Sequence, residues 1–235
     1  MAPSMRSALL SFVSILGLLT VPAWGATAGY PDMPGSSEGD VDFIDISETS
    51  NTDPLPLFGE PTRIGNQLFF FPTSFVSTST DGNLGMTDET SSTLSVTIVA
   101  GEGYYIQSIT FSELGDYILT GIGTDATFAS VTGTMTANPG NLVANLDIVP
   151  APPYYSPGSG AYQGYAVIDL SGMDLTQVEL TVGNILQTGS EPHTTASIQK
   201  NIISAPTIDV KVIPEPGCLF LLALGGAALI RRRRT

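Results

Sequence analysis

The chain of 235 residues carries 22 acids against 8 bases, a formal charge of −14, and it contains a single cysteine. Most bases lie near the ends, so the body keeps only Arg63, Lys200 and Lys211 and repels phosphate backbones, which excludes nucleic acid as a partner. Because Cys218 lies close to the C-terminus, no disulfide can link two parts of the body.

The first 28 residues have the three-part layout of a secretory signal peptide. Arg6 precedes an apolar stretch over 8–21, Pro22 ends that stretch, and small residues follow. This layout predicts a signal helix over 1–28 that is cleaved after Gly25 or after Ala28, the second site fitting slightly better. An uncleaved anchor is the alternative, but a spanning helix needs about 20 apolar residues. Residues 29–40, rich in Pro, Gly, Ser and acids, are expected to be a flexible lead-in.

Residues 41–212 are predicted to form one all-β domain. Apolar and polar residues alternate over 93–98, 142–148, 178–182 and 208–212, which is typical of antiparallel strands with one buried face. Turn residues separate these runs, and about ten such strands favour an antiparallel β-sandwich of jelly-roll type. A closed barrel is the alternative. The solid apolar run over 68–71 is expected to be a central strand covered on both faces.

The body offers little support for catalysis. His193, its only histidine, follows Pro192 and precedes two threonines, which indicates an exposed loop residue rather than part of a nucleophilic triad. A glycosidase needs two carboxylates, but chance pairs are expected in so acidic a chain. The acidic group at 40, 42 and 45 is better explained as a solvated strand edge. We therefore expect no catalytic residues and no required cofactor.

Two binding sites are alternatives to a purely structural body. One acidic loop holds four candidate calcium ligands, Asp81, Asn83, Asp88 and Glu89. Calcium prefers such oxygen ligands, although the spacing differs from that of an EF-hand, and a solvated loop is the competing explanation. Tyr154 and Tyr155, in the proline-rich segment 151–160, are expected to be exposed together, where their rings could stack on sugars.

The last 23 residues, 213–235, form a second membrane-related segment. Ile213-Pro214-Glu215-Pro216 comes first, an apolar run over 217–230 follows, and a cationic cluster ends the segment at Arg231, Arg232, Arg233 and Arg234. The prolines favour an extended backbone, and the arginines stay on the cytoplasmic side of a membrane. The apolar run is short for a permanent anchor, so we expect a short transmembrane helix that stops export temporarily. A tail anchor that is never cut is the alternative.

This ordered set of tripeptide, apolar run and arginine cluster resembles the PEP-CTERM sorting signal of Gram-negative surface and matrix proteins. The resemblance implies that Pro214, Glu215 and Pro216 are recognised by an exosortase, a membrane-embedded transpeptidase-like processing enzyme. Cys218 departs from the small or hydroxylated residues expected there. The segment 57–117 is also similar to bodies of PEP-CTERM surface proteins of unassigned function.

From both ends together we expect an exported protein that crosses the inner membrane and then reaches the cell surface or the extracellular matrix. It would meet the secretion machinery and the exosortase, and would touch a membrane only through its terminal segments. Its body would be a non-catalytic structural or adhesive module in the exopolysaccharide layer. A carbohydrate-binding module, with or without calcium, is the alternative.

Overall fold

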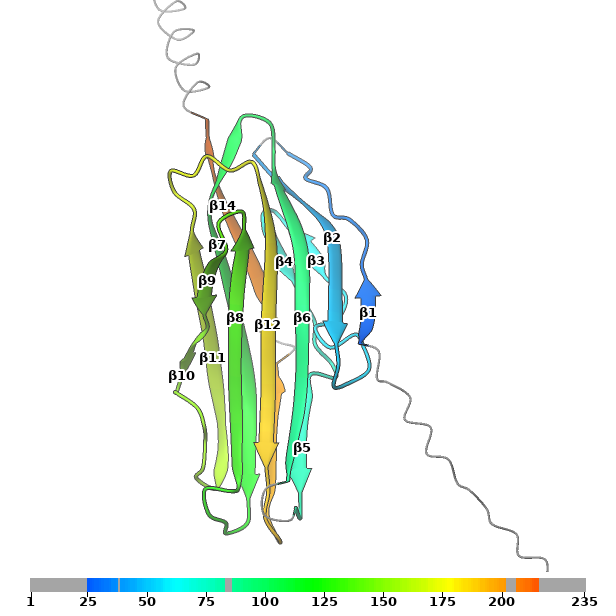
Figure 1. Ribbon diagram of the computed structural model, residues 1–235, viewed down its shortest axis with the longest axis vertical. Coiled ribbons are helices and arrows are strands. Elements are labelled where there is room, and N and C mark those ends of the chain that lie inside the picture. The colour runs from blue at the N-terminus through cyan, green and yellow to red at the C-terminus, as the bar shows by residue number, and fades with distance from the viewer. Residues whose placement is uncertain (1–24, 38, 83–85, 202–205, 216–235) are drawn as a thin grey trace, which may run out of the picture.

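Two antiparallel β-sheets pack face to face, and their strands run along the long axis of the molecule (Figure 1). The computed structural model describes residues 25–37, 39–82, 86–201 and 206–215. Fourteen strands and no helix occur in these ranges, so the all-β antiparallel sandwich is confirmed. No helix in this part of the chain is long and apolar enough to cross a bilayer. The expected signal helix and tail helix lie outside the described residues.

The first sheet, which faces the viewer in Figure 1, has six strands. In spatial order they are β1 (Ala26–Gly29), β2 (Val41–Ser50), β6 (Thr87–Ala100), β12 (Gln177–Gly189), β8 (Phe128–Asn138) and β9 (Leu142–Asn145). The two end strands, β1 and β9, do not pair with each other, so this sheet is open and does not close into a barrel.

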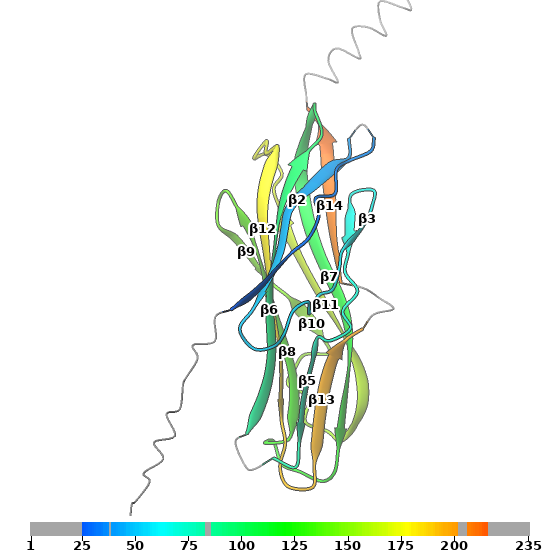
Figure 2. The same cartoon turned by 90° about the vertical axis from the view of Figure 1, so that its right-hand side faces the viewer.

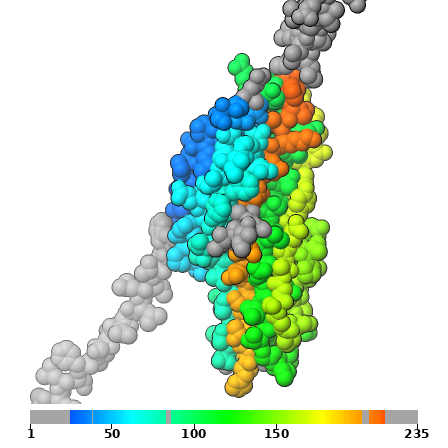
Figure 3. All heavy atoms as spheres, turned by 180° about the vertical axis from the view of Figure 1, so that it is seen from behind, coloured from blue at the N-terminus to red at the C-terminus, as the bar shows by residue number. Residues whose placement is uncertain are grey.

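The second sheet lies behind the first, and Figure 2 shows the two layers separated, with β6 and β12 in one and β13 and β14 in the other. Its order is β10 (Asp147–Val149), β11 (Gly158–Asp169), β7 (Tyr104–Thr120), β14 (Thr207–Pro214), β4 (Gln67–Phe69) and β3 (Thr62–Ile64). In addition, β13 (Thr195–Lys200) pairs with both β7 and β5 (Val76–Thr80). Seen from behind, the cyan segment that includes β3 and β4 lies beside the orange β14 (Figure 3).

The long strand β7 shares one of its edges between two partners. β14 pairs with its first half and β13 with its second half, while β11 covers the other edge along most of its length. At the junction, Lys200 is in register with Gly115, and the Asn201 amide donates to Leu114 O at 2.8 Å. This arrangement places Lys200 at the middle of β7 rather than at a sheet end.

Burial follows the predicted alternation closely in the long strands. Leu94, Val96 and Ile98 of β6 are buried, whereas the threonines and serines between them face outward. The run over 142–148 is divided, because β9 joins the first sheet and β10 the second. The prediction of a central strand over 68–71 is wrong. The strand β4 covers only Gln67–Phe69 and lies next to the edge strand β3. Side chains alternate along this short segment, so Phe70 is buried whereas Phe71 is 43% exposed.

A buried carboxylate holds the segment 51–61 over the end of the core. Glu48 Oε1 accepts hydrogen bonds from the amides of Leu57 and Phe58 at 3.0 and 2.9 Å. The same oxygen accepts the Ser92 hydroxyl at 2.6 Å, and Oε2 accepts the Tyr30 hydroxyl at 2.7 Å. Four donors therefore replace the water that this carboxylate loses on burial.

The segment held in this way delivers an aromatic ring to the core. Phe58 packs edge-on against Phe70 and Phe75, with ring centroids 5.9 and 5.2 Å apart. Such edge-to-face contacts stabilise aromatic clusters beyond their buried area. The cluster closes the core next to Lys200, whose ammonium lies 4.8 Å from the Phe75 ring.

The segment 29–40, expected to be flexible, is paired with the sandwich over its first part. Gly29 belongs to β1, which pairs with the end of β2, and the Tyr30 amide donates to Ile46 O at 2.8 Å. Met33 and Phe43 exchange two backbone hydrogen bonds. Because β1 also contains Ala26–Ala28, cleavage after Gly25 would preserve this strand, whereas cleavage after Ala28 would remove most of it.

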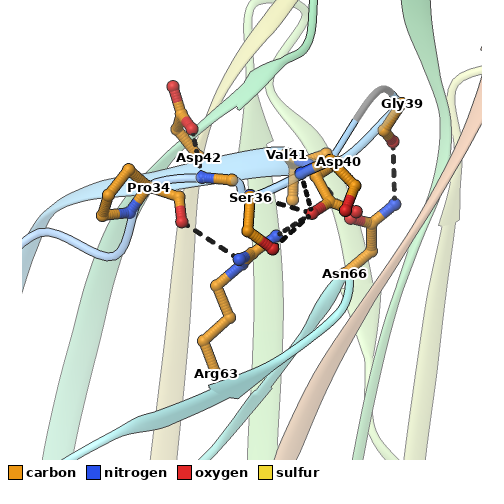
Figure 4. Close-up of polar contacts among 10 residues, drawn as sticks. Pro34, Ser36, Gly39, Asp40, Val41, Asp42, Arg63 and Asn66 are labelled. Carbon is orange, nitrogen blue, oxygen red and sulfur yellow. Dashed lines mark hydrogen bonds and ion pairs between the residues drawn. The ribbon is translucent and has the colours of Figure 1, made fainter.

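Asp40 and Asp42, predicted to be part of a solvated strand edge, form hydrogen bonds that hold the rest of this segment (Figure 4). Asp40 accepts the amides of Ser36 and Ser37 and forms an ion pair with Arg63 of β3 at 3.1 Å. The Ser36 amide first, and then Arg63, lower the pKa of the Asp40 carboxyl. Asp42 accepts the amide of Gly35. These contacts connect the N-terminal segment to the β3–β4 hairpin.

Candidate functional site

The outward face of the first sheet is covered by hydroxyl side chains arranged in rows across the strands. Strand alternation turns these residues away from the core, and the strand register brings them side by side. One row is Ser47, Ser95, Thr181 and Thr136. The next is Thr49, Thr93, Gly183 and Thr134, followed by Asn145 of β9. Short β-branched hydroxyl residues suit a pleated surface that is half exposed.

A groove of about 650 Å³ crosses this face at the second row. Its lining comes from β2, β6, β12 and β8, and from the segment 145–152 at the sheet edge. Since neighbouring strands lie about 4.8 Å apart, a groove over five such elements is about 19 Å long. Gly183 lies in the middle of the row, where the absence of a side chain deepens the surface.

The groove combines hydroxyl groups with aliphatic surface and is almost uncharged. Thr49, Thr93, Thr132 and Thr134 contribute hydroxyl groups, which both donate and accept hydrogen bonds. Asp147 is the one charged residue among the described residues that line it. A glycosidase site needs two carboxylates on either side of the bond to be cleaved. The groove therefore suits binding of a neutral polar ligand better than hydrolysis.

The two tyrosines expected to be exposed together lie in different environments. Tyr154 is 7% exposed and stacks on Tyr117 with ring centroids 3.9 Å apart, and its hydroxyl donates to Pro150 O at 2.9 Å. Burial raises the pKa of Tyr154 to about 12. Tyr155 is 44% exposed. The expectation of joint exposure is wrong for Tyr154, because a bridge to Ala129 fixes the segment against β8 and turns that ring inward.

The candidate calcium ligands do not converge in the part of the loop that the structure describes. Asp81 accepts the His193 amide at 2.8 Å, and Asp88 accepts the Thr78 amide at 2.8 Å. Asp88 and Glu89 are consecutive in β6 and so point to opposite faces. Asn83 lies outside the described residues. No group of three His, Cys, Asp or Glu side chains suited to a metal ion occurs within the described ranges.

The lone histidine and the sorting residues also have defined positions. His193 is exposed in the turn between β12 and β13, as predicted for a loop residue. Pro214 ends β14 and is exposed, and the Glu215 amide donates to Gly103 O at 2.8 Å. Pro216 and Arg231 to Arg234 lie outside the described residues.

The sequence did not predict the groove, although the alternating serines and threonines that contribute to it are visible in the chain. Serine and threonine occupy every second position over 91–97 and 130–136. The strand order β2-β6-β12-β8 brings these runs together, and this order depends on contacts between residues far apart in sequence. The register that places Gly183 between Thr93 and Thr134 has the same origin.

Comparisons with known proteins give no family for this chain. No family model matches it, and no curated protein matches it either. Among solved structures it is similar to infectious bursal disease virus, Gx strain, at 13% identity over 74% of this chain, with a TM-score of 0.22. The Gt strain gives 11% identity over 73% of this chain and a TM-score of 0.17. The chain spans about half the length of these viral chains, 53% and 52%.

Proposed function

We propose that this chain is an exported, non-catalytic surface or matrix protein that is sorted through a PEP-CTERM segment. The observation that carries the proposal is the ordered set at 213–235: Pro-Glu-Pro, an apolar run, and four arginines. A signal helix at the N-terminus and a short transmembrane helix at 217–230 complete it. The exported chain passes through the inner membrane and ends at the cell surface or in the exopolysaccharide layer.

The geometry at the end of the sandwich supports this proposal. β14 runs to Pro214, and the following amide is the last backbone contact with the body in the described range. The strand ends at the tip of the molecule, at the top of Figure 1. Pro214 is exposed at the end of β14, so an enzyme in the membrane can approach this tip from the side away from the bulk of the domain. Pro214 also fixes its own backbone in an extended conformation.

The test is mass spectrometry of the C-terminus of the protein recovered from its native location. We expect the wild-type chain to end close to Pro216, without the apolar run. A variant in which Arg231, Arg232, Arg233 and Arg234 are all serine should keep its tail, because the stop that holds it in the membrane is gone. Lys211→Ser, which removes an exposed cation of β14, is the control and should be processed normally. Normal trimming of the four-serine variant would contradict the proposal.

The groove favours a second function, the binding of a neutral polysaccharide of the matrix. Its length accommodates a short oligosaccharide, and the hydroxyl groups that β2, β6 and β8 contribute can pair with sugar hydroxyls. Its single carboxylate, Asp147, gives no second group for glycoside hydrolysis. This function requires no metal ion.

Gly183→Tyr tests this second function by filling the groove. A Cβ atom at Gly183 would meet only Thr134 Oγ1, at an ordinary distance of 3.4 Å, so the substitution should not disturb the fold. Thr181→Tyr is the matched control, because Thr181 lies on the same strand and face but one row outside the groove. Electrophoresis in gels containing exopolysaccharide should retard the parent and Thr181→Tyr but not Gly183→Tyr. Equal mobility of all three proteins with and without polysaccharide would reject the groove as a glycan site.

A further inference from the structure

Lys200 is a fully buried base in a strongly acidic protein. The body has three bases, and Lys200 is the one whose side chain is 0% exposed. It ends β13, and its ammonium lies 4.8 Å from the ring of Phe75 and 5.3 Å from that of Phe58. Its polar contact is with Glu113 Oε2 of β7, whose side chain is also 0% exposed. Moving two charged side chains out of water costs free energy. The solubility that surface charges provide therefore does not explain why Lys200 and Glu113 are in the core.

The third member of this cluster comes from the opposite sheet. Asn184 of β12 donates its side-chain amide to the same oxygen, Glu113 Oε2, at 2.7 Å. A primary amine and a carboxamide, carried by different sheets, therefore meet at one carboxylate oxygen in the core. Glu113 Oε1 and Asn184 Oδ1 are buried and have no hydrogen-bond partner among the described residues. Ordinary structural networks leave few such atoms unpaired, as the four donors around Glu48 illustrate.

The strands around the cluster provide space for it. Each member has a glycine as a cross-strand partner: Lys200 faces Gly115, Glu113 faces Gly164, and Asn184 faces Gly133 on one side and Ser92 on the other. A Cβ atom on Gly133 would approach Asn184 Nδ2 to 3.0 Å, and one on Gly164 would approach Glu113 Cγ to 2.9 Å. Glycine in a strand interior weakens the strand and marks a close approach. Gly133 and Gly164 therefore leave room for Asn184 and Glu113, whereas Gly115 leaves room for the Tyr162 ring and Gln199 O.

The protonation state of Lys200 also favours chemistry. Desolvation lowers the pKa of Lys200, and the carboxylate of Glu113 opposes this shift without cancelling it. Transfer of one proton from Lys200 to Glu113 leaves a neutral amine beside a carboxylic acid, which removes both charges from the core. A neutral, desolvated lysine amine is a nucleophile.

We propose that Lys200 and Asn184 form an intramolecular amide cross-link, with Glu113 as the proton carrier. Lys200 Nζ attacks Cγ of Asn184, a new C–N bond forms, and the bond from Cγ to Nδ2 breaks with release of ammonia. Glu113 Oε2, protonated by the first transfer from Lys200, gives that proton to the leaving nitrogen and then accepts the second proton that Nζ loses, which its contacts with both groups allow. Carboxamide and amine become a substituted amide and ammonia, so no oxidant, metal or other reactant is needed.

The cross-link would connect the two sheets through the core. β12 belongs to the first sheet and β13 to the second, so the bond joins layers that are otherwise held by packing and hydrogen bonds. The body has no cysteine, and an amide provides a covalent connection that reducing agents do not break. The rings of Phe58 and Phe75 cover Lys200, so water is excluded from the reacting atoms.

Mass spectrometry of the purified full chain tests the proposal. After denaturation, digestion with chymotrypsin cleaves after Leu186 and separates Asn184 from Lys200 in an unlinked chain. We expect one joined peptide that contains both residues and is lighter than the two separate peptides by one molecule of ammonia. Separate, unmodified peptides from the folded protein would overturn the proposal. A joined peptide linking Lys200 to Glu113 with loss of water would overturn the assignment of Asn184 as the acceptor.

Variants separate the roles of the three residues. Lys200→Arg and Glu113→Gln should yield unlinked peptides, whereas Lys211→Arg, on the exposed side of β14, should yield the joined peptide. Asn184→Asp provides a readout that does not depend on loss of function. Its reaction releases water instead of ammonia and ends at the same amide, so its joined peptide should have the same mass as that of the parent. A folded Glu113→Gln variant that still cross-links fully would remove Glu113 from the reaction.

Discussion

The side-chain amide of Asn184 in β12 donates to the carboxylate of Glu113 in β7, and this 2.7 Å bond connects the two sheets through the core. The two residues are 71 positions apart in the chain. Together with Lys200 they form a buried polar cluster between the two sheets. The other buried carboxylates in the described part of the chain, Glu48 and Glu191, are surrounded by donors that satisfy them.

Glu48→Ala should lower the free energy of unfolding by about 3 kcal/mol. The substitution leaves the amides of Leu57 and Phe58 without an acceptor, and a buried unsatisfied donor costs about 1–3 kcal/mol. Urea denaturation followed by fluorescence measures this difference. Glu89→Ala, an exposed carboxylate in the neighbouring β6, is the control and should change stability by less than about 0.5 kcal/mol. Equal stability of the two variants would show that Glu48 does not hold the segment 51–61.

Gly115→Ala should destabilise the protein by about 1–3 kcal/mol, the usual effect of overpacking a core. A Cβ atom on Gly115 would collide with the Tyr162 ring and with Gln199 O, which are both fixed in the second sheet. Gly183→Ala on β12 is the matched control, since a Cβ atom there meets only Thr134 Oγ1 at 3.4 Å. Thermal unfolding should show a lower Tm for the first variant and an unchanged or higher Tm for the second. The reverse order would contradict the packing described for β7.

Acidification should remove a stabilising contribution from Glu191. The Thr124 amide, then the Thr127 and Thr124 hydroxyl groups, lower the pKa of this carboxyl. A depressed folded-state pKa stabilises the protein above the unfolded-state pKa, and this contribution disappears as pH falls through the folded-state value. Urea titrations from pH 7 to pH 3 should therefore show a smaller decline in Glu191→Gln than in the parent. The exposed Glu60→Gln should follow the parent, and an unchanged slope in Glu191→Gln would contradict this role.

Tyr154→Ala and Tyr155→Ala should differ sharply in stability. Tyr154 is buried and stacked on Tyr117, so removing its ring should cost about 3–5 kcal/mol, as for other buried aromatic residues. Tyr155 is 44% exposed, and its loss should change the unfolding free energy by less than about 0.5 kcal/mol. Chemical denaturation of both variants makes the comparison. Equal destabilisation by the two substitutions would contradict this arrangement.

The mature protein should begin at Ala26. The strand β1, Ala26–Gly29, pairs with Ser47–Ser50 of β2, and cleavage after Gly25 leaves all four of these residues in place. Cleavage after Ala28 would remove three of them and expose the edge of β2. N-terminal sequencing of the exported protein distinguishes the two sites. A mature chain that starts at Gly29 would show that β1 does not belong to the exported domain.

The alternation of residues predicted much of the fold, but only at the level of single strands. Side chains alternate between faces with a period of two, so the buried positions of β6, β12 and β14 could be read from neighbouring residues. The run over 68–71 also alternates, since Leu68 and Phe70 are buried and Phe71 is exposed, but its unbroken apolar composition suggested a central strand. A short apolar run does not reveal whether a strand lies in the centre of a sheet or near its edge.

What the sequence determined by itself is the set of local properties: the acidic body, the absence of cysteine from it, the strand periodicity, and the ordered residues of the C-terminal segment on which the sorting proposal rests. Tertiary structure decided which strands are neighbours, and so which distant residues meet. It placed Gly183 among the hydroxyl rows, and it brought Lys200, Glu113 and Asn184 to one point. The physical reason is that strand order and register are set by packing of the whole core, whereas residue periodicity is set by the backbone of one strand.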